Sequence, residues 1–159
     1  MTQQATGMLV NRSITVAAPV ERAFGVFTDQ FDAWWPRTHH IGDAEMDVAV
    51  LEPWRGGRWY EKGVDGSECG WGRVLIWEPP HRLMVSWQID VNWKHEPDPT
   101  TASEIEVRFT PEGPSQTRVE LEHRAFERHG DDGKTIHDAV GGEGGWGALL
   151  ERYAAALHA

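Results

Sequence analysis

The chain has 159 residues, a formal net charge of −10 at pH 7 and one cysteine, Cys69. This acidic balance repels nucleic acid backbones and anionic membrane surfaces, so neither is an expected partner. A single cysteine excludes an internal disulfide and a multi-cysteine zinc site. Residues 1–12 lack the layout of a signal peptide and no apolar run could span a membrane, so we expect a cytoplasmic protein with one domain over residues 1–159.

The first elements predicted are a strand and two short helices. Alternating residues over 9–16 predict the strand. Pro19 suits the first turn of a helix, and the apolar face that follows predicts a helix ending near Asp29. Aromatic residues at 31, 34 and 35 predict a second helical turn, closed by Pro36. We expect these helices to form a lid over one mouth of the domain.

The next segments predict strands. Short runs over 47–54 and 58–64 are separated by turn signals, and an apolar hairpin over 71–89 is joined at Pro79-Pro80. No helix intervenes, so the strands must pair antiparallel. Gly70 and Gly72 predict a bulge in the hairpin.

Two further strands are predicted over 103–113 and 117–126 because polar and apolar residues alternate strictly. One face of this pair should be dry, and the other, which carries Glu104, Glu106 and Arg108, should be wet. The segment HGDDGKT, residues 129–135, is predicted to be a mobile loop.

The last element predicted is a helix with one apolar stripe that closes the core against the dry face of the sheet. The stripe follows the spacing i, i+3, i+4, i+7 and i+11 and consists of Trp146, Leu149, Leu150, Tyr153 and Leu157.

Five segments, in this order and spacing, resemble one known superfamily over nearly the whole chain. They are ITVAAPVERAFGVFTD (14–29), GGRWYE (56–61), WGRVLIWEPPHRLMVSWQI (71–89), SEIEVRFTPEG (103–113) and GGWGALLERYAAAL (144–157). The chain resembles the SRPBCC (START-like, helix-grip) superfamily and, within it, proteins similar to the activator of heat-shock protein 90 ATPase.

The resemblance implies an α+β fold, in which a curved antiparallel sheet of about six or seven strands wraps a long C-terminal helix and two short helices follow the first strand. It also implies a deep cavity in many members but no single activity, since lipid carriers, hormone carriers and cyclases are all related. Chaperone binding is not expected, because the eukaryotic namesake looks like a protein with an additional N-terminal domain that performs much of that contact.

Candidate ligand-binding residues are those that should face the interior between the sheet and the last helix. They are Trp35, His40, Trp59, Glu61, Trp87, Phe109, Trp146 and Tyr153. Glu61 would need a hydrogen-bond donor there, or would instead pair with an arginine at the sheet edge. Trp87 points inward, where it touches ligand or fills core. A buried Tyr153 phenol needs a partner, which a ligand could supply.

The histidines show no metal-binding pattern. His39 and His40 are adjacent and should point apart, while His123, His129 and His137 lack a zinc spacing, so all five are interpreted as surface loop residues. No metal or cofactor is expected. No GxSxG motif frames a nucleophilic serine.

Three hypotheses therefore stand. The leading one is a non-catalytic module that binds a small apolar or aromatic molecule between sheet and helix. The second is a cyclase-like or hydrolase-like enzyme with His40 and Glu61 as acid and base, which requires both side chains to converge on one pocket. The third is an interaction protein whose exposed aromatic residues form a homodimer or a partner surface.

Overall fold

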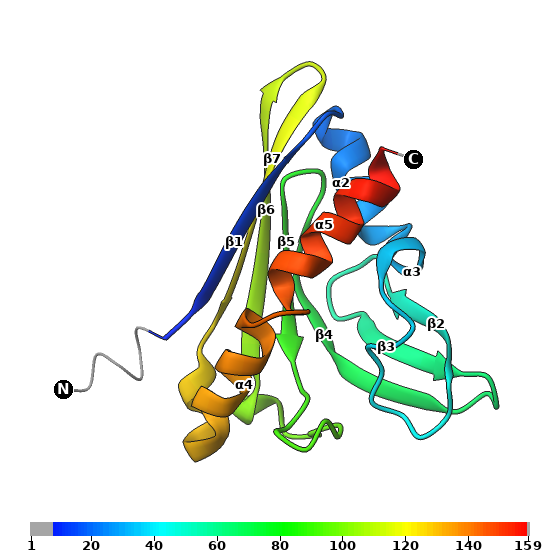
Figure 1. Ribbon diagram of the computed structural model, residues 1–159, viewed down its shortest axis with the longest axis vertical. Helices are drawn as coiled ribbons and strands as arrows, with labels where there is room; N and C mark the ends of the chain where they lie inside the picture. The colour runs from blue at the N-terminus through cyan, green and yellow to red at the C-terminus, as the bar shows by residue number, and fades with distance from the viewer. Residues whose placement is uncertain (1–7, 159) are drawn as a thin grey trace.

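The computed structural model describes residues 8–158 and contains one curved antiparallel sheet with helices packed on its concave side (Figure 1). The strands are β1 (Val10–Val16), β2 (Met46–Leu51), β3 (Arg58–Gly63), β4 (Glu68–Glu78), β5 (Arg82–Trp87), β6 (Ser103–Gly113) and β7 (Gln116–Arg124). The helices are α2 (Val20–Thr28), α3 (Phe31–Trp34), η1 (Pro99–Thr101), η2 (Phe126–Asp132), α4 (Gly133–Gly141) and α5 (Trp146–Leu157).

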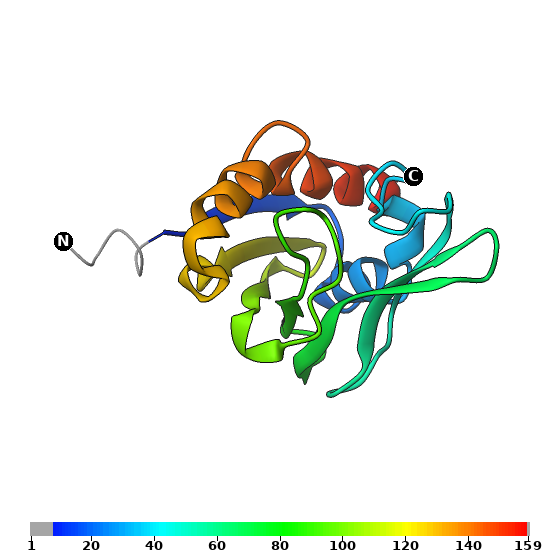
Figure 2. The ribbon, with the colours of Figure 1, turned by 90° about the horizontal axis from the view of Figure 1, so that it is seen from below.

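The sheet has seven strands in the order β1-β7-β6-β5-β4-β3-β2, so the first strand lies beside the last. Viewed from below, α5 and α4 lie over the sheet, which curls beneath them (Figure 2). This arrangement confirms the predicted helix-grip fold, including the two short helices after the first strand. Most of residues 1–12, where no signal peptide was expected, lie outside the described residues. Among residues 8–158, no helix has the length and apolarity needed to cross a membrane.

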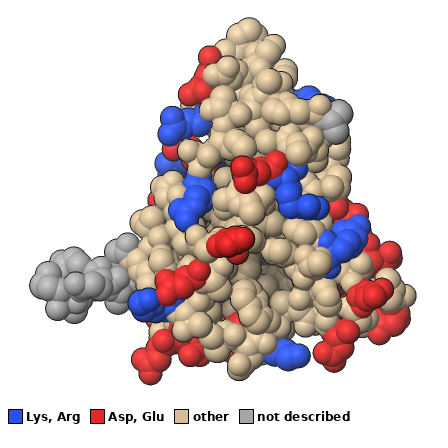
Figure 3. Space-filling model, in the orientation of Figure 1, with Lys and Arg blue, Asp and Glu red and all other residues tan. Residues whose placement is uncertain are grey.

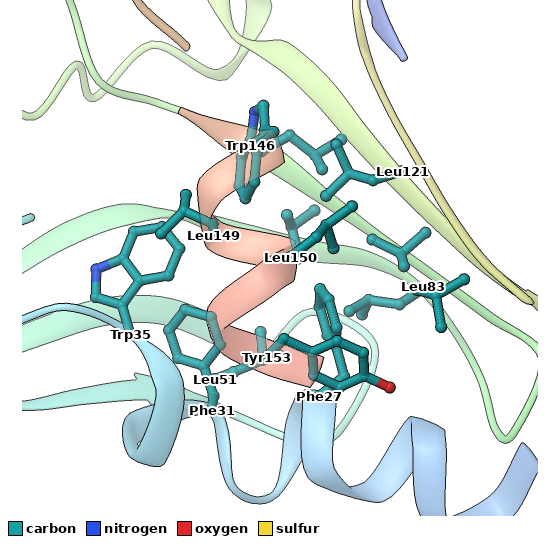
Figure 4. Close-up of a cluster of buried hydrophobic side chains, with 14 of the residues drawn as sticks. Phe27, Phe31, Trp35, Leu51, Leu83, Leu121, Trp146, Leu149, Leu150 and Tyr153 are labelled. Carbon is teal, nitrogen blue, oxygen red and sulfur yellow. The ribbon is translucent and has the colours of Figure 1, made fainter. Parts of the chain in front are cut away.

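The core forms between α5 and the concave face of the sheet. Leu150 points from α5 toward Leu83 and Leu121 of the sheet, whereas Leu149 lies on the opposite side of the helix, beside Trp35 (Figure 4). The inward-facing residues of β6 and β7 alternate as the sequence predicts, and Ile105, Val107 and Phe109 are all buried. The apolar stripe of α5 and the dry face of the sheet therefore make one continuous core.

The predicted bulge lies in β4, and it turns Trp71 inward. Trp59 pairs with Gly72 while Tyr60 pairs with Gly70, so Trp71 is the extra residue of β4. A Cβ atom on Gly72 would lie 1.9 Å from the carbonyl oxygen of Ser86, which explains why only glycine fits. The bulge bends the sheet and buries the Trp71 side chain.

One error of the sequence prediction concerns residues 129–135, which form helical turns with a kink at Gly130 rather than a loop. They span the end of η2 and the start of α4. Gly133 suits this start because a Cβ there would lie 2.3 Å from the carbonyl oxygen of Phe126. Ile136 and Val140, four residues apart, are buried and anchor α4.

A second error concerns Glu106, which was predicted on the wet face but is buried on the outer side of the sheet. Its carboxylate accepts hydrogen bonds from Arg82, Arg108 and Arg124 at 2.5, 3.0 and 2.7 Å. Burial raises the pKa of Glu106, but these hydrogen bonds outweigh it and lower the pKa to about 2.

On the face that carries α5, Lys and Arg are interspersed with Asp and Glu (Figure 3).

Candidate functional site

A cavity of about 420 Å³ opens near the N-terminus of α5 and is lined mainly by indole rings. Its wall includes five of the nine tryptophans, Trp35, Trp71, Trp87, Trp93 and Trp146. The other lining residues are Thr38, His39, His40, Ile41, Ile89, Ala139, Val140, Glu143, Gly144, Gly145 and Leu149. Its volume falls within the range of small-molecule sites, roughly 300–1,000 Å³.

The indoles contact one another around the cavity. Trp35 lies 5.2 Å from Trp71 and 6.1 Å from Trp146 between ring centroids, and Trp87 lies 6.2 Å from Trp146. Trp93 is 46% exposed at the mouth and packs edge-on to Trp87 at 6.5 Å. The cavity thus offers ring faces and edges on several sides.

Three of these indoles use their single donor on the protein itself. Trp35 Nε1 donates to the carbonyl of His39 at 2.9 Å, and Trp71 Nε1 donates to Glu61 at 3.0 Å. Trp146 Nε1 donates to His123 at 3.0 Å. The buried Nε1 of Trp87 has no acceptor among the described residues. Polar contacts to a ligand must therefore come mainly from other side chains.

Those other side chains gather at one edge of the cavity. The rim loop, residues 36–45, supplies Thr38, His39 and His40, and the loop between α4 and α5 supplies Glu143. His39 Nε2 lies 2.9 Å from the carbonyl oxygen of Gly144 and joins the two loops. The cavity is consequently aromatic in its depth and polar at its rim.

Glu61 organises the rim loop from below. It is 1% exposed, and its carboxylate accepts from the backbone N–H of Ile41 at 2.6 Å, from that of Gly42 at 3.2 Å and from Trp71 Nε1. The alternative of an arginine partner at the sheet edge is therefore wrong, and the predicted need for a donor is met by backbone and indole groups.

His40 and Glu61 lie close together, but only His40 lines the cavity, so the convergence on one pocket that the enzyme hypothesis requires is met by His40 alone. His40 Nδ1 lies 3.0 Å from the carbonyl oxygen of Gly42, and since a carbonyl only accepts, Nδ1 carries the proton. The Glu61 carboxylate lies 3.9 Å from the same nitrogen. In the neutral ring Nε2 then has the free lone pair and can accept a hydrogen bond.

The candidate residues from the sequence divide into three groups. Trp35, His40, Trp87 and Trp146 line the cavity. Trp59 and Glu61 are buried behind its wall, where the Trp59 ring lies 5.3 Å from Trp71.

Phe109 and Tyr153 do not line this cavity and lie deeper in the core. Both rings pack on Phe27. The Tyr153 hydroxyl donates to the carbonyl of Ala23 at 2.7 Å, so the protein itself supplies the partner that a ligand was expected to supply. Burial raises the pKa of Tyr153 above its ordinary value.

Sequence reasoning missed His123, which was interpreted as a surface residue but is fully buried on β7. Its position alternates with Val119 and Leu121 on the inward face, and this parity was the available signal. Trp71, Trp93 and Glu143 were also not selected. Within residues 8–158, no group of three or more His, Cys, Asp or Glu side chains is arranged to hold a metal ion.

Comparison with known proteins identifies relatives over nearly the full chain. The model of the family "Activator of Hsp90 ATPase homolog 1-like protein" matches residues 17–158. No curated protein sequence matches the chain.

Among solved structures, the anthrahydroquino-gamma-pyrone synthase Txn09, complexed with SUM, is 46% identical, with a TM-score of 0.66 and coverage of 93% of this chain and 96% of that one. CalC, a self-sacrificing resistance protein from Micromonospora echinospora, is 28% identical, with a TM-score of 0.66 and coverage of 94% and 93%.

Protein NE0264 from Nitrosomonas europaea is 15% identical, with a TM-score of 0.67 and coverage of 95% and 94%. This third likeness concerns the fold alone. The family match and the fold together show that the chain belongs to the activator of Hsp90 ATPase homolog 1-like family, within the helix-grip (SRPBCC) superfamily.

Proposed function

We propose that the cavity binds a planar polycyclic aromatic molecule of the anthrahydroquinone class and that the protein closes a γ-pyrone ring on it. The observation that carries this proposal is the five-tryptophan cavity with a polar rim, in a chain 46% identical to an anthrahydroquino-gamma-pyrone synthase.

The shape and polarity of the cavity support an aromatic ligand with oxygens along one edge. Flat fused rings would stack against the indoles, where aromatic pairs contribute about 0.5–1.5 kcal/mol each beyond their buried area. The ketone and hydroxyl oxygens of such a molecule would meet Thr38, His39 and His40 at the rim. The ligand's reacting edge is then held beside the rim loop while its apolar rings fill the depth of the cavity.

The His40–Glu61 pair supports catalysis over simple carriage. Closing a γ-pyrone ring by addition alone requires a phenolic oxygen to lose its proton and to form a C–O bond to the distal carbon of an alkynyl ketone, whose triple bond becomes the ring double bond. His40 Nε2 would take the phenolic proton, the electron pair of the alkyne would pass to the ketone oxygen, and the imidazolium would return the proton to the carbon next to the ketone. Glu61, 3.9 Å from Nδ1, would stabilise the imidazolium while it exists.

The binding step is tested by titrating the protein with 1,8-dihydroxyanthraquinone and following the quenching of tryptophan fluorescence. Trp87→Phe replaces one indole of the cavity wall with a smaller ring. It breaks no hydrogen bond within the described structure, because Trp87 Nε1 has no acceptor there. We expect about tenfold weaker binding. The matched control is Trp54→Phe, which changes an indole that is 53% exposed and outside the cavity. Equal affinity of the two variants would contradict binding in this cavity.

The catalytic step is tested with His40→Asn, because an Asn amide can still donate to the carbonyl of Gly42 but offers no basic nitrogen. The substrate is an anthrahydroquinone with an uncyclised alkynyl ketone side chain, and pyrone formation is followed by mass spectrometry and absorbance under anaerobic conditions. We expect loss of turnover with retained binding, whereas His81→Asn on the exposed β4–β5 turn should behave as wild type. Binding without turnover in the wild-type protein would support a carrier instead.

A further inference from the structure

A series of hydrogen bonds runs from the cavity wall to His129 in η2. It begins at Trp146 Nε1, which donates to His123 Nδ1 at 3.0 Å. It continues from His123 Nε2 to Ser103 Oγ at 2.8 Å, and from Ser103 Oγ to His129 Nε2 at 2.8 Å. His123 and Ser103 are both 0% exposed, so water does not take part in these contacts.

The chemistry of the four groups fixes the direction of each bond. An indole nitrogen can only donate, so His123 Nδ1 must accept and carries no proton. The proton of the neutral imidazole is then on Nε2 and is donated to Ser103 Oγ. The Ser103 hydroxyl is left to donate to His129 Nε2. In this arrangement Trp146 Nε1, both ring nitrogens of His123 and Ser103 Oγ all have a hydrogen-bond partner.

His123 can keep Trp146 in place only while its ring is neutral. Burial, followed by the charges of His129 and His137, lowers the pKa of His123 well below its ordinary value. A proton on Nδ1 would place two N–H donors against each other at the position of the present hydrogen bond. The surroundings of His123 therefore preserve its capacity to accept from the indole.

The same imidazole supports a second cavity tryptophan from behind. The His123 ring packs on Phe126 with centroids 4.3 Å apart and lies 5.3 Å from Trp87. Trp87 and Trp146 pack edge to face with ring centroids 6.2 Å apart, and both line the cavity. Only the Trp146 indole is fixed by a hydrogen bond, because the Trp87 nitrogen has no acceptor within the described structure.

We propose that His123 is a positioning residue that fixes the Trp146 indole as a wall of the cavity, and that the affinity for a planar aromatic ligand depends on this contact. The inference rests on the proposed function for the class of ligand. His123 itself does not line the cavity, so it acts through the orientation of Trp146 and not by touching the ligand.

Two substitutions separate the two hydrogen bonds of His123. The amide of Asn lies where the imidazole has Nδ1, so His123→Asn can still accept from Trp146 but loses Ser103. The amide of Gln lies where the imidazole has Nε2, so His123→Gln keeps the contact to Ser103 and loses Trp146. Both remove the buried ring, so loss of the packing on Phe126 is common to the pair.

Two readouts apply to both variants, after urea unfolding has confirmed that each is folded under the conditions used. The first is the ¹H–¹⁵N resonance of the Trp146 indole, assigned with Trp146→Phe, together with its rate of hydrogen exchange. The second is the dissociation constant for 1,8-dihydroxyanthraquinone. We expect slow exchange and an affinity within about threefold of wild type for His123→Asn, and fast exchange with about tenfold weaker binding for His123→Gln.

The outcomes distinguish this inference from the function on which it rests. Equal affinities in the two variants, or protected indole exchange in His123→Gln, would overturn the positioning role. If the wild-type protein fails to bind 1,8-dihydroxyanthraquinone, the proposed ligand class is wrong. The indole exchange of the two variants then still decides whether His123 holds Trp146.

Discussion

Replacing Glu61 with Gln is expected to destabilise the protein by about 2 kcal/mol and to loosen the rim loop. One carboxylate oxygen accepts from Ile41 N and Trp71 Nε1, at 2.6 and 3.0 Å, and the other accepts from Gly42 N at 3.2 Å. Gln retains one acceptor oxygen, so two of the three bonds survive in a weaker, uncharged form. Its amide N–H₂ would face the N–H of Gly42, which loses its partner.

The magnitude follows from these losses. Hydrogen bonds to a charged group contribute about 1.5–3 kcal/mol net and neutral ones about 1 kcal/mol. Losing one charged bond and weakening two others is partly offset because burying a neutral amide costs less than burying a carboxylate. With a urea m-value of about 2 kcal/mol/M, the unfolding midpoint should fall by about 1 M at unchanged m.

The matched control is Glu68→Gln on the neighbouring strand. Glu68 forms an exposed ion pair with Arg58 at 2.9 Å, and such pairs contribute little to stability. Its unfolding midpoint should stay close to that of wild type. A Glu61→Gln midpoint equal to that of Glu68→Gln would refute the conclusion that the buried carboxylate holds the rim loop.

Three other predictions concern stability. The pKa of Glu106 is about 2 in the folded protein against an ordinary 4.5. The stability that this group contributes is therefore complete above about pH 4.5 and is lost as the pH falls toward 2. In Glu106→Gln, urea unfolding should show a smaller loss of unfolding free energy over that pH range. Gly72→Ala should lower the free energy of unfolding by about 3 kcal/mol or more, because the new Cβ would lie 1.9 Å from a β5 carbonyl oxygen. Gly25→Ala in α2, where the new Cβ would meet open space, should be neutral or stabilising. Equal melting temperatures of the two variants would contradict this. Tyr153→Phe removes a buried hydrogen bond to an α2 carbonyl and should lower the unfolding free energy by about 1 kcal/mol in urea titrations. An unchanged value would show that this hydrogen bond contributes nothing net.

The proposed site joins parts of the chain that are far apart in sequence. The rim loop is tied to β3 through Glu61, to the α4–α5 loop through His39, and to the aromatic wall through Trp35. A single substitution at Glu61 should therefore alter the positions of both His40 and Trp71. This coupling predicts that binding and turnover are more sensitive to Glu61 than its place behind the cavity wall would indicate.

The errors of the sequence prediction have a common origin in tertiary contacts. Residues 129–135 contain glycines and aspartates that are typical of loops, yet α4 forms because Ile136 and Val140 can pack on the core. Glu106 shows the alternation of an exposed residue, but three arginines from β5, β6 and β7 cover it. Each case depends on neighbours that local propensity does not include.

The sequence alone determined the order of the strands, the inward faces of β6 and β7 and the apolar stripe of α5, because the periods of 2 and 3.6 residues are local properties of the backbone. Only the tertiary structure decided which tryptophans line a cavity and which fill the core. Glu61 meets Ile41 across 20 residues and Trp146 meets His123 across 23, and both contacts depend on how the bulged sheet curves around α5. The curvature of the sheet results from small changes of twist that accumulate over seven strands, so no short stretch of sequence specifies it.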